Sequence, residues 1–286
     1  MIALFPRGSR VVAAAAAFAL VAACSATPAP PGAADAGGAP CPSGRGPTMV
    51  RVVSKSAGTF CIDSTEVTRD DYAGFTREVA GGKMTSKLVA CANDADPTPD
   101  ATCLKDPRVC KGDACGRHPQ VCVDLCDAAG YCEWAGKRLC FADARTAGAR
   151  TPLREEWELA CSLGVNPDTG RNFRDWPYGD GQQLNAETCN IGLRSGTGCG
   201  PNPTGCSTLP VGSLPDCQGS VPGVYDLGGN VMEFVDVGAA TPAGGAAVGP
   251  SFAFGRTASE ALSANCGFLL RGATRDFEIG FRCCAD

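Results

Sequence analysis

The chain has 286 residues, with 25 lysines and arginines against 30 aspartates and glutamates, which gives a formal net charge of −5. Nucleic-acid binding relies on clustered basic side chains, and the sequence contains no basic block, so we expect no nucleic-acid partner. The 19 cysteines and the single histidine indicate instead a domain that is stabilised by disulfides.

The N-terminus has the pattern of a secretory signal. Arg7 and Arg10 precede an apolar run, residues 11–23, that is short for a membrane span, and Cys24 follows it directly. The ending Val-Ala-Ala-Cys resembles a bacterial lipobox, whose cysteine is lipidated and becomes the first residue of the mature chain. We therefore predict a lipoprotein signal peptide over residues 1–24 with Cys24 as the lipid anchor. The alternative is an ordinary signal peptide with a chance cysteine.

A segment of alanine, proline and glycine follows, over residues 25–46, with almost no large apolar side chains. Such a segment cannot build a core, so we expect a flexible tether between the membrane and the domain. Residues 47–286, about 240 in all, are enough for one large domain with a real core. The expected location is the bacterial cell envelope, on the periplasmic or outer-membrane face.

The cysteine count supports this location. Setting aside the expected lipid anchor leaves 18 cysteines, an even number, as complete pairing requires. Disulfides at this density persist in oxidising compartments, so we expect an extracytoplasmic domain. The competing interpretation is a zinc protein, but zinc sites usually contain C-x2-C pairs. Here Cys110 and Cys115 are separated by four residues, Cys122 and Cys126 by three, and His118 is the sole histidine, so we expect no structural zinc.

The first elements of the domain are two short runs of β-branched or alternating residues, 48–53 and 59–63, which predict paired strands. A helix is expected over residues 69–80, because apolar residues recur there at helical spacing. Thr68 and Asp71, three residues apart, form the pattern of a capping pair at its start.

Residues 81–120 hold four cysteines among proline, aspartate and glycine, and we expect a disulfide-stapled loop insertion there. A second helix is predicted over residues 125–135, with Gly136 as its C-terminal stop. A third is expected to begin near Pro152 and to bury Trp157. Short strands and loops make up the rest, so the fold class is α+β with irregular connections rather than a doubly wound sheet.

Five segments, in this order, resemble the successive motifs of a known family: FCIDSTEVT, YCEWAGKRL, TPLREEWELA, YDLGGNVMEF and IGFRCC. The family is that of the formylglycine-generating enzymes, also called the sulfatase-modifying factor domain, and the chain is similar to its cysteine-rich bacterial lipoprotein branch. Each motif is weak alone, but five in the family order are specific. The resemblance covers residues 47–286 and implies a variant of the C-type-lectin fold with little regular secondary structure, bound calcium and disulfides.

The resemblance also assigns structural roles. It implies a disulfide between Cys132 and Cys283, and core-facing guanidiniums at Arg138 and Arg282 that carboxylates and carbonyls satisfy, since a buried unpaired charge is very costly. The alternative for both arginines is a solvated surface position. The sequence departs from the family pattern by the insertion of residues 140–150 before the third helix.

In the family, the loop equivalent to YDLGGNVMEF binds calcium through a carboxylate or amide side chain, two backbone carbonyls and a glutamate. These ligands carry over to Asp226, Gly229, Val231 and Glu233. Calcium accepts six to eight oxygen ligands in flexible geometry, and a glycine-rich bend allows successive carbonyls to point inward. The alternative is that Glu233 simply pairs with a core arginine beside a tight turn.

A second family calcium site is only partly represented. Asn190 and Ile191 match its first two ligands, but the region that should supply a later aspartate reads GPNPTGC. Without that carboxylate, we expect this site to be weak or lost.

The copper pair of the family enzymes is missing from the sequence. Those enzymes hold copper(I) with two cysteines separated by four residues and oxidise a substrate cysteine with oxygen; soft thiolates suit copper(I). Here Cys266 is the one weak catalytic candidate, the position five residues before it is Ala261, and no cysteine lies between Cys217 and Cys266. We expect Cys266 to be in a disulfide, with Cys161 as the candidate partner, and we expect no copper cofactor.

Other catalytic chemistry finds little support. A related branch of the superfamily holds non-haem iron, which needs several histidines, and a lone His118 cannot supply them. We therefore expect a lipid-anchored domain without the catalytic pair that works as a binding or surface module for a protein or glycan ligand. The alternatives are a divergent oxidoreductase of the same family that acts on a peptide or small thiol, and a structural envelope protein.

Overall fold

The computed structural model describes residues 40–54, 58–80, 84, 86–88, 91–92, 96–142, 155–163, 165–166, 171–172, 176–177, 188–192, 207–238, 245–253 and 265–286. These residues belong to one compact unit, Pro40–Asp286. The predicted signal peptide, with Cys24, and most of the predicted tether lie outside them. No helix in these stretches combines the length and the hydropathy that crossing a membrane requires.

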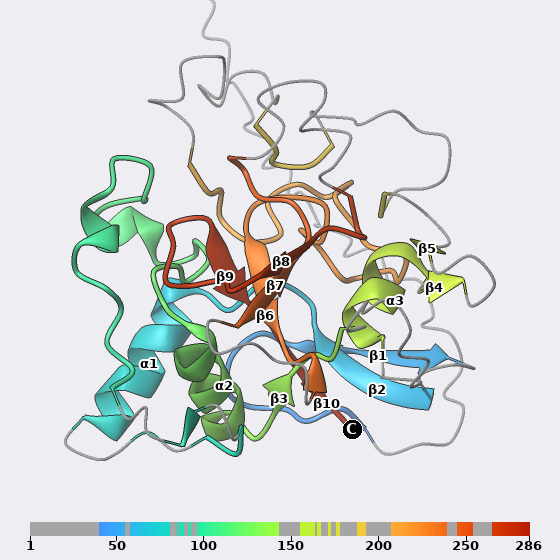
Figure 1. The fold of residues 1–286 in the computed structure, drawn as a ribbon, viewed down its shortest axis with the longest axis horizontal. Coiled ribbons are helices and arrows are strands. Elements are labelled where there is room, and N and C mark those ends of the chain that lie inside the picture. The colour runs from blue at the N-terminus through green and yellow to red at the C-terminus, as the bar shows by residue number, and fades with distance from the viewer. Residues whose placement is uncertain are drawn as a thin grey trace, which may run out of the picture. The chain divides into compact units, whose positions relative to one another are not determined.

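The N-terminal hairpin forms one edge of a four-stranded sheet. Strands β1 (Met49–Ser54) and β2 (Gly58–Asp63) pair antiparallel, as the alternating pattern predicts. Strands β10 (Cys283–Ala285) and β3 (Arg138–Leu139) complete the order β1-β2-β10-β3. The C-terminus therefore returns to the N-terminal hairpin, which Figure 1 shows at the lower part of the molecule.

The first two helices begin and end close to the predicted residues. Helix α1 (Arg69–Val79) starts with the expected capping box, in which the Asp71 backbone N–H donates to Thr68 Oγ1 at 3.1 Å. Helix α2 (Leu125–Trp134) is capped by Asp124 and is followed by Gly136 at φ +75°, a conformation that glycine adopts without strain. Local capping chemistry therefore sets these boundaries.

The third helix, α3 (Glu156–Ser162), begins later than the prediction of a start near Pro152. Residue 155 is its N-cap, and the residues around Pro152 lie outside the described stretches. The tertiary contacts explain the later start: the Glu156 carboxylate binds Arg138 and accepts the Phe141 N–H, which fixes the first turn. Trp157 is buried, as expected.

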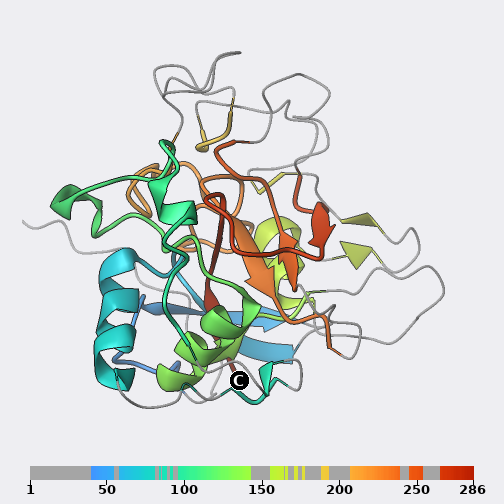
Figure 2. The same ribbon diagram turned by 60° about the vertical axis from the view of Figure 1, so that its left-hand side comes forward.

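A second sheet has the order β8-β7-β6-β9. Its strands are β6 (Met232–Val235), β7 (Ala246–Val248), β8 (Leu269–Arg271) and β9 (Ile279–Phe281). Strand β6 pairs antiparallel with β7 and parallel with β9. Helices α1 and α2 lie on one side of this sheet and α3 on the other (Figures 1 and 2).

The alternation of side chains along β6 divides the core into two clusters. Met232 and Phe234 pack with the apolar residues of α1 and α2, whereas Val235 packs with those of α3. Successive strand residues point to opposite faces, so Glu233 shares the α3 side with Val235. The fold thus places a carboxylate in the centre of the molecule, next to Trp157.

Short irregular elements complete the architecture. They are the 3-10 turns η2 (Cys103–Lys105) and η3 (Asp113–Cys115) and the two-residue strands β4 (Val165–Asn166) and β5 (Arg171–Asn172). The turns lie in the region that the sequence analysis treats as a stapled insertion.

Eight disulfides join all sixteen cysteines of the described residues. The pairs are Cys41–Cys61, Cys91–Cys126, Cys103–Cys122, Cys110–Cys115, Cys132–Cys283, Cys140–Cys284, Cys161–Cys266 and Cys189–Cys217. The pair implied by the resemblance, Cys132 and Cys283, is therefore joined, between α2 and β10. The remaining cysteines of the expected mature chain, Cys199 and Cys206, lie outside the described residues.

The folded part begins before residue 47. The Cys41–Cys61 bridge ties the preceding segment to β2, and Arg45 stacks over the Trp134 ring and binds Glu78 at 2.8 Å. Composition alone predicts a tether at residues 40–46, because it does not show these contacts with distant parts of the chain.

Candidate binding cleft and buried charge cluster

Glu233 is bound by a buried arginine. Arg282 Nε donates to Glu233 Oε2 and Arg282 Nη2 to Oε1, each at 2.7 Å. Trp157 Nε1 donates to the same Oε2 at 2.7 Å. The Arg282 side chain is 0% exposed, and it also donates to the carbonyls of Asp63 and Tyr225. A two-point charge-assisted pair of this kind satisfies a charge that burial alone would make very costly.

The second expected core arginine is only partly buried. Arg138 binds the buried carboxylate of Glu156 through two nitrogens, each at 2.7 Å, and reaches the exposed carboxylate of Asp286 at 2.8 Å. Its side chain remains 23% exposed. Carboxylates therefore satisfy both guanidiniums, as the family resemblance implies.

Two further carboxyl groups, Glu66 and Asp226, lie beside this ion pair. Asp226 Oδ2 accepts the Gly212 N–H at 2.6 Å. Glu66 Oε1 accepts from Asn230 Nδ2 at 3.0 Å, whereas its buried Oε2 has no hydrogen-bond partner. Repulsion between the two buried carboxyl groups disfavours ionising both, so the site favours a retained proton or a cation.

Burial raises the pKa of both carboxyl groups. The pKa of Glu66 lies well above its usual range because of desolvation and then repulsion from Asp226. The pKa of Asp226 is also raised, chiefly by desolvation, although the Gly212 N–H and the Arg282 charge oppose the shift. Three carboxyl groups, including Glu233, thus face one guanidinium, and the fully ionised cluster carries excess negative charge.

The residues expected to bind calcium meet around this cluster. Asp226 and Glu233 supply side chains, and Gly229 and Val231 lie on the bend between them, where a Cβ on Gly229 would come within 2.6 Å of the Asn190 carbonyl oxygen. No three histidine or acidic side chains of the described part of the chain already enclose a metal position. The excess negative charge and the unpartnered Glu66 oxygen nevertheless fit a hard cation. Glu233 Oε1 accepts only one of the described hydrogen bonds and so keeps a lone pair for a ligand bond.

The second predicted calcium pair adjoins the first through Asn230. Asn190 Nδ2 donates to Asn230 Oδ1 at 3.1 Å and to the Ser207 carbonyl at 3.2 Å, whereas its buried Oδ1 has no partner. Ile191 is buried beside it. The region that lacks the family aspartate lies outside the described residues.

A surface cleft of about 370 Å³ adjoins the buried carboxyl groups. It is lined by Gly46, Pro47, Thr48, Ser64, Thr65, Thr68, Asp71, Arg117, Val211, Gly212 and Tyr225. Thr65 precedes Glu66, Tyr225 precedes Asp226, and the Gly212 N–H binds Asp226, so the cleft and the buried cluster share a wall.

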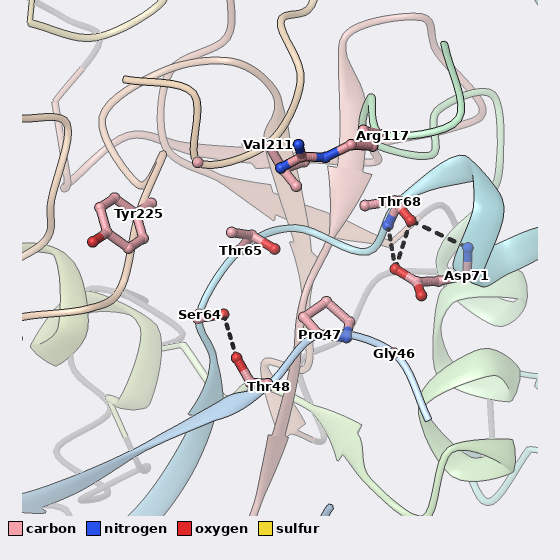
Figure 3. Close-up of a pocket in the computed structure, with 11 residues that line it drawn as sticks. Gly46, Pro47, Thr48, Ser64, Thr65, Thr68, Asp71, Arg117, Val211 and Tyr225 are labelled. Carbon is pink, nitrogen blue, oxygen red and sulfur yellow. Dashed lines mark hydrogen bonds between the residues drawn. The ribbon is translucent and has the colours of Figure 1, made fainter. Parts of the chain in front are cut away.

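Hydroxyl groups dominate the polar lining of this cleft. Figure 3 shows Thr48 and Ser64, 3.2 Å apart, on one side and Arg117 with Val211 on the opposite side. Thr68 is held by Asp71 through a 2.6 Å hydrogen bond. Sequence reasoning missed this cleft because its wall combines five segments that are distant along the chain. Two of them belong to the FCIDSTEVT and YDLGGNVMEF motifs, but neither motif shows that the fold brings them together.

The candidate catalytic residue, Cys266, has no free thiol. It is bonded to Cys161 of α3, with 5.8 Å between the two Cα atoms, and both residues are buried. Ala261, five residues before Cys266 in the sequence, lies outside the described residues.

His118 is buried next to a disulfide. Its Nδ1 lies 2.8 Å from Thr208 Oγ1, and its Nε2 lies 3.5 Å from the Sγ atom of Cys110. Burial, followed by the charge of Arg69, lowers the pKa of this imidazole. No pattern in the sequence predicts that His118 lies beside a sulfur.

Comparison with known proteins identifies the family. The model of the sulfatase-modifying factor enzyme 1-like domain matches residues 30–286. The formylglycine-generating enzyme of Streptomyces coelicolor is 31% identical over 135 residues, which is 40% of this chain and 38% of that enzyme, so the match spans about two fifths of each.

Two solved structures resemble the chain at 21% identity. PvdO from Pseudomonas aeruginosa is covered over 81% of its length, against 80% of this chain, with a TM-score of 0.47. CarF is covered over 86% of its length, against 80% of this chain, with a TM-score of 0.43. Because the domain model covers most of the sequence, the chain belongs to the formylglycine-generating enzyme, or sulfatase-modifying factor, family and has its disulfide-rich α+β fold.

Proposed function

We propose that the chain is a lipid-anchored, extracytoplasmic member of this family that has lost copper-dependent cysteine oxidation and works as a binding module. The observation that carries the proposal is the disulfide between Cys161 and Cys266. Copper(I) requires soft thiolate ligands, and a sulfur in a disulfide is not a thiolate. With Ala261 in place of the second cysteine, neither position offers the ligand that the family enzymes use.

The alternative is a divergent oxidoreductase of the same family that acts on a peptide or small thiol. If it used copper, it would need two thiols from elsewhere in the chain. All sixteen cysteines of the described residues are in disulfides, so Cys199 and Cys206 are the remaining source in the expected mature chain. Cys199 and Cys206 are separated by six residues rather than by the four of the family pair, so they do not match its copper ligands. The expected mature chain has an even number of cysteines, which favours a disulfide between these two.

The high density of disulfides supports a location in the cell envelope. A domain with this density of disulfides is stable in an oxidising compartment, and the sequence before it has the pattern of a lipoprotein signal with Cys24 as the anchor. Incorporation of labelled palmitate in a bacterial host tests the anchor: the label should disappear in Cys24→Ser, and unchanged labelling would contradict the lipid attachment.

The cleft of Figure 3 is the proposed binding site, and its lining favours a glycan. Threonine and serine hydroxyls both donate and accept hydrogen bonds, which suits the hydroxyl groups of a sugar. The exposed Arg117 adds a donor from the opposite side, and the ring of Tyr225 adds a flat surface. An apolar ligand would leave these polar groups without partners.

Calcium is the proposed structural ion of this module. Asp226 and Glu233 would hold it with their carboxylates and Gly229 and Val231 with their carbonyls, next to the unpartnered oxygen of Glu66. A bound calcium ion supplies the positive charge that offsets the buried carboxylates. Because Asp226 binds the Gly212 N–H, a fixed Asp226 also fixes one wall of the cleft.

Copper(I) binding by the full chain, measured by competition with a chromogenic copper(I) chelator and without added reductant, tests the loss of the copper site. We expect no stoichiometric binding by the wild type. The double variant Cys161→Ser, Ala261→Cys restores two cysteines at the family spacing and provides the positive control. Tight binding of one copper ion by the wild type would contradict the proposal and favour the oxidoreductase alternative.

Binding of envelope oligosaccharides, measured by calorimetry on the full chain, tests the cleft. We expect Arg117→Ala and Thr65→Val to abolish binding, and Arg77→Ala, on the exposed face of α1, to leave it unchanged. Equal binding by the cleft variants and the wild type would contradict the assignment of the site.

A further inference from the structure

We propose that Cys110 and Cys115 form a redox-active disulfide that accepts two electrons from a dithiol substrate, with His118 and Arg69 stabilising the Cys110 thiolate. This activity is separate from copper chemistry and from the glycan cleft. It rests on three features of the segment from Cys110 to His118: the length of the loop, the groups around one sulfur, and access from solvent.

The Cys110–Cys115 bridge closes the shortest loop among the described disulfides. Its sequence separation is 5, whereas the other seven range from 19 to 151. In the chain-entropy model the stabilisation by a disulfide grows with the loop it closes, so this bridge contributes the least. The Cys103–Cys122 bridge already encloses the same segment. The Cys110–Cys115 bridge therefore adds little to the stability of the domain, so stabilisation does not explain its presence.

The environment of Cys110 favours its thiolate. His118 Nε2 lies 3.5 Å from the Cys110 sulfur, and Arg69 Nη1 donates to the Cys110 carbonyl at 2.6 Å. A neighbouring guanidinium and a hydrogen-bond donor both stabilise a thiolate, which makes it a better leaving group and makes its disulfide easier to reduce. Thr208, 2.8 Å from His118 Nδ1, orients the ring, so Nε2 faces the sulfur.

The neutral state of the His118 imidazole allows it to accept a proton. Burial and the charge of Arg69 lower its pKa, so the imidazole is neutral near neutral pH. A neutral ring can take the proton from an approaching thiol and return it to a departing thiolate.

The two cysteines also differ in exposure. Cys110 is half-buried, whereas Cys115 is 1% exposed, so Cys110 is the more open of the two to an attacking thiolate. A cleft of about 290 Å³ runs beside the loop and is lined in part by Arg69, Gly112 and Asp113. This cleft offers a surface for the chain that carries the substrate thiols.

The chemistry proceeds in two exchanges. The first substrate thiol gives its proton to His118 Nε2, and its sulfur attacks Cys110 Sγ. The bond between Cys110 and Cys115 breaks, and Cys115 leaves as a thiolate that takes the proton from His118.

The second substrate thiol then gives its proton to His118 and attacks the substrate sulfur of the mixed disulfide. Cys110 leaves as a thiolate beside Arg69 and the protonated His118. The substrate dithiol has lost two electrons and two protons and become a disulfide. The protein disulfide has gained both electrons, with one proton on Cys115 and one on His118.

The wild-type molecule contains its own controls. Three other disulfides, Cys41–Cys61, Cys91–Cys126 and Cys103–Cys122, also join one half-buried cysteine to one buried cysteine. His118 is the sole histidine in the sequence, so none of them has an imidazole partner.

Equilibration of the full chain in a series of glutathione redox buffers, followed by differential alkylation and mass spectrometry, tests the proposal. The equilibrium constant for reduction of Cys110–Cys115 by glutathione should exceed that of Cys103–Cys122 at least tenfold, which corresponds to about 30 mV. Reduction of Cys110–Cys115 together with or after Cys103–Cys122 would overturn the proposal. This comparison is made within one molecule and needs no variant.

Variants assign the roles of the two neighbouring groups. His118→Ala and Arg69→Met should each lower the reduction constant of Cys110–Cys115 several-fold and raise the thiol pKa of Cys110 in the reduced chain. Arg77→Met removes a charge from the same helix two turns away and should change neither quantity. A dithiol peptide should be oxidised stoichiometrically by the wild type and not by the double variant Cys110→Ser, Cys115→Ser. Equal oxidation by that double variant would also overturn the proposal.

Discussion

Arg282 and Glu233 form a fully buried ion pair in the centre of the domain, with two hydrogen bonds of 2.7 Å. The pair joins Arg282, which lies between β9 and β10, to β6, one of the two inner strands of the second sheet. It therefore connects the terminal GFRCC motif with the bend that the sequence analysis assigns to calcium.

Arg282→Met should destabilise the domain strongly, because it leaves the Glu233 carboxylate buried without its charged partner. Breaking a buried pair in this way costs about 3–5 kcal/mol of unfolding free energy. Arg45→Met is the matched control, since Arg45 pairs with Glu78 at an exposed site, where an ion pair contributes about 1 kcal/mol or less. Urea denaturation of the two variants measures both values. A loss for Arg282→Met no larger than that for Arg45→Met would contradict the role of the buried pair.

The disulfides Cys132–Cys283 and Cys140–Cys284 should be strongly non-additive. Each closes a loop of roughly 150 residues, with sequence separations of 151 and 144, and either bridge alone holds β10 near α2 and β3. Removing one should cost about 2–3 kcal/mol, whereas removing both releases the long loop and should add about 5 kcal/mol by the chain-entropy estimate. Denaturation of the two paired serine variants and of the fourfold variant measures the difference. Simple additivity would contradict this account.

Calcium should raise the melting temperature of the full chain. A ligand that binds the folded state at 100 times its dissociation constant adds about 2.7 kcal/mol. Asp226→Asn should remove most of this dependence, because a charged ligand is lost, while Asp216→Asn, at an exposed position close by, should keep it. Identical melting of the wild type in calcium and in chelator would rule out the calcium proposal.

In the presence of a calcium chelator, the unfolding free energy of the domain should fall as the pH rises from about 4 to about 8. The folded-state pKa of Glu66 and that of Asp226 are both raised, so the folded state binds protons more tightly than the unfolded state. Their contribution is complete below the unfolded pKa, near 4, and is lost as the pH passes through the raised values. Burial raises the pKa of Asp63 to about 7, which adds to the loss in the same window.

The control for this pH dependence is Glu66→Gln, which removes one of the titrating groups but keeps an oxygen to accept the Asn230 hydrogen bond. Its melting temperature should vary less with pH than that of the wild type. Calcium should reduce the dependence in the wild type, since the ion replaces the proton in offsetting the buried charge. Higher stability at pH 8 than at pH 5 in chelator would contradict the expected sign.

The sequence predicts the elements whose boundaries depend on local chemistry. The capping box of Thr68 and Asp71 and the C-terminal Gly136 set the ends of two helices, so their positions agree with the structure within one residue. The second sheet was not predicted strand by strand. Strands such as β7 have only three residues, all buried, and therefore show no alternation of apolar and polar side chains.

The candidate site is harder to predict from the sequence, because its contacts join residues that are far apart along the chain. The Cys132–Cys283 pair came from the family resemblance, because the pattern of cysteines alone does not fix which of them pair. The shared wall of the cleft and the buried cluster depends on Gly212 and Asp226 meeting across the fold. The contact between His118 and Cys110 likewise depends on the turn that η3 makes.

The most direct test of the central claim is mass spectrometry of a cysteine-containing sulfatase-type peptide incubated with the full chain, copper(I), oxygen and a thiol reductant. The account predicts that the peptide mass stays unchanged, because the sulfur of Cys266 is bonded to Cys161 and its copper partner position is Ala261. Loss of the substrate sulfur with formation of an aldehyde, abolished by Cys266→Ala, would contradict it.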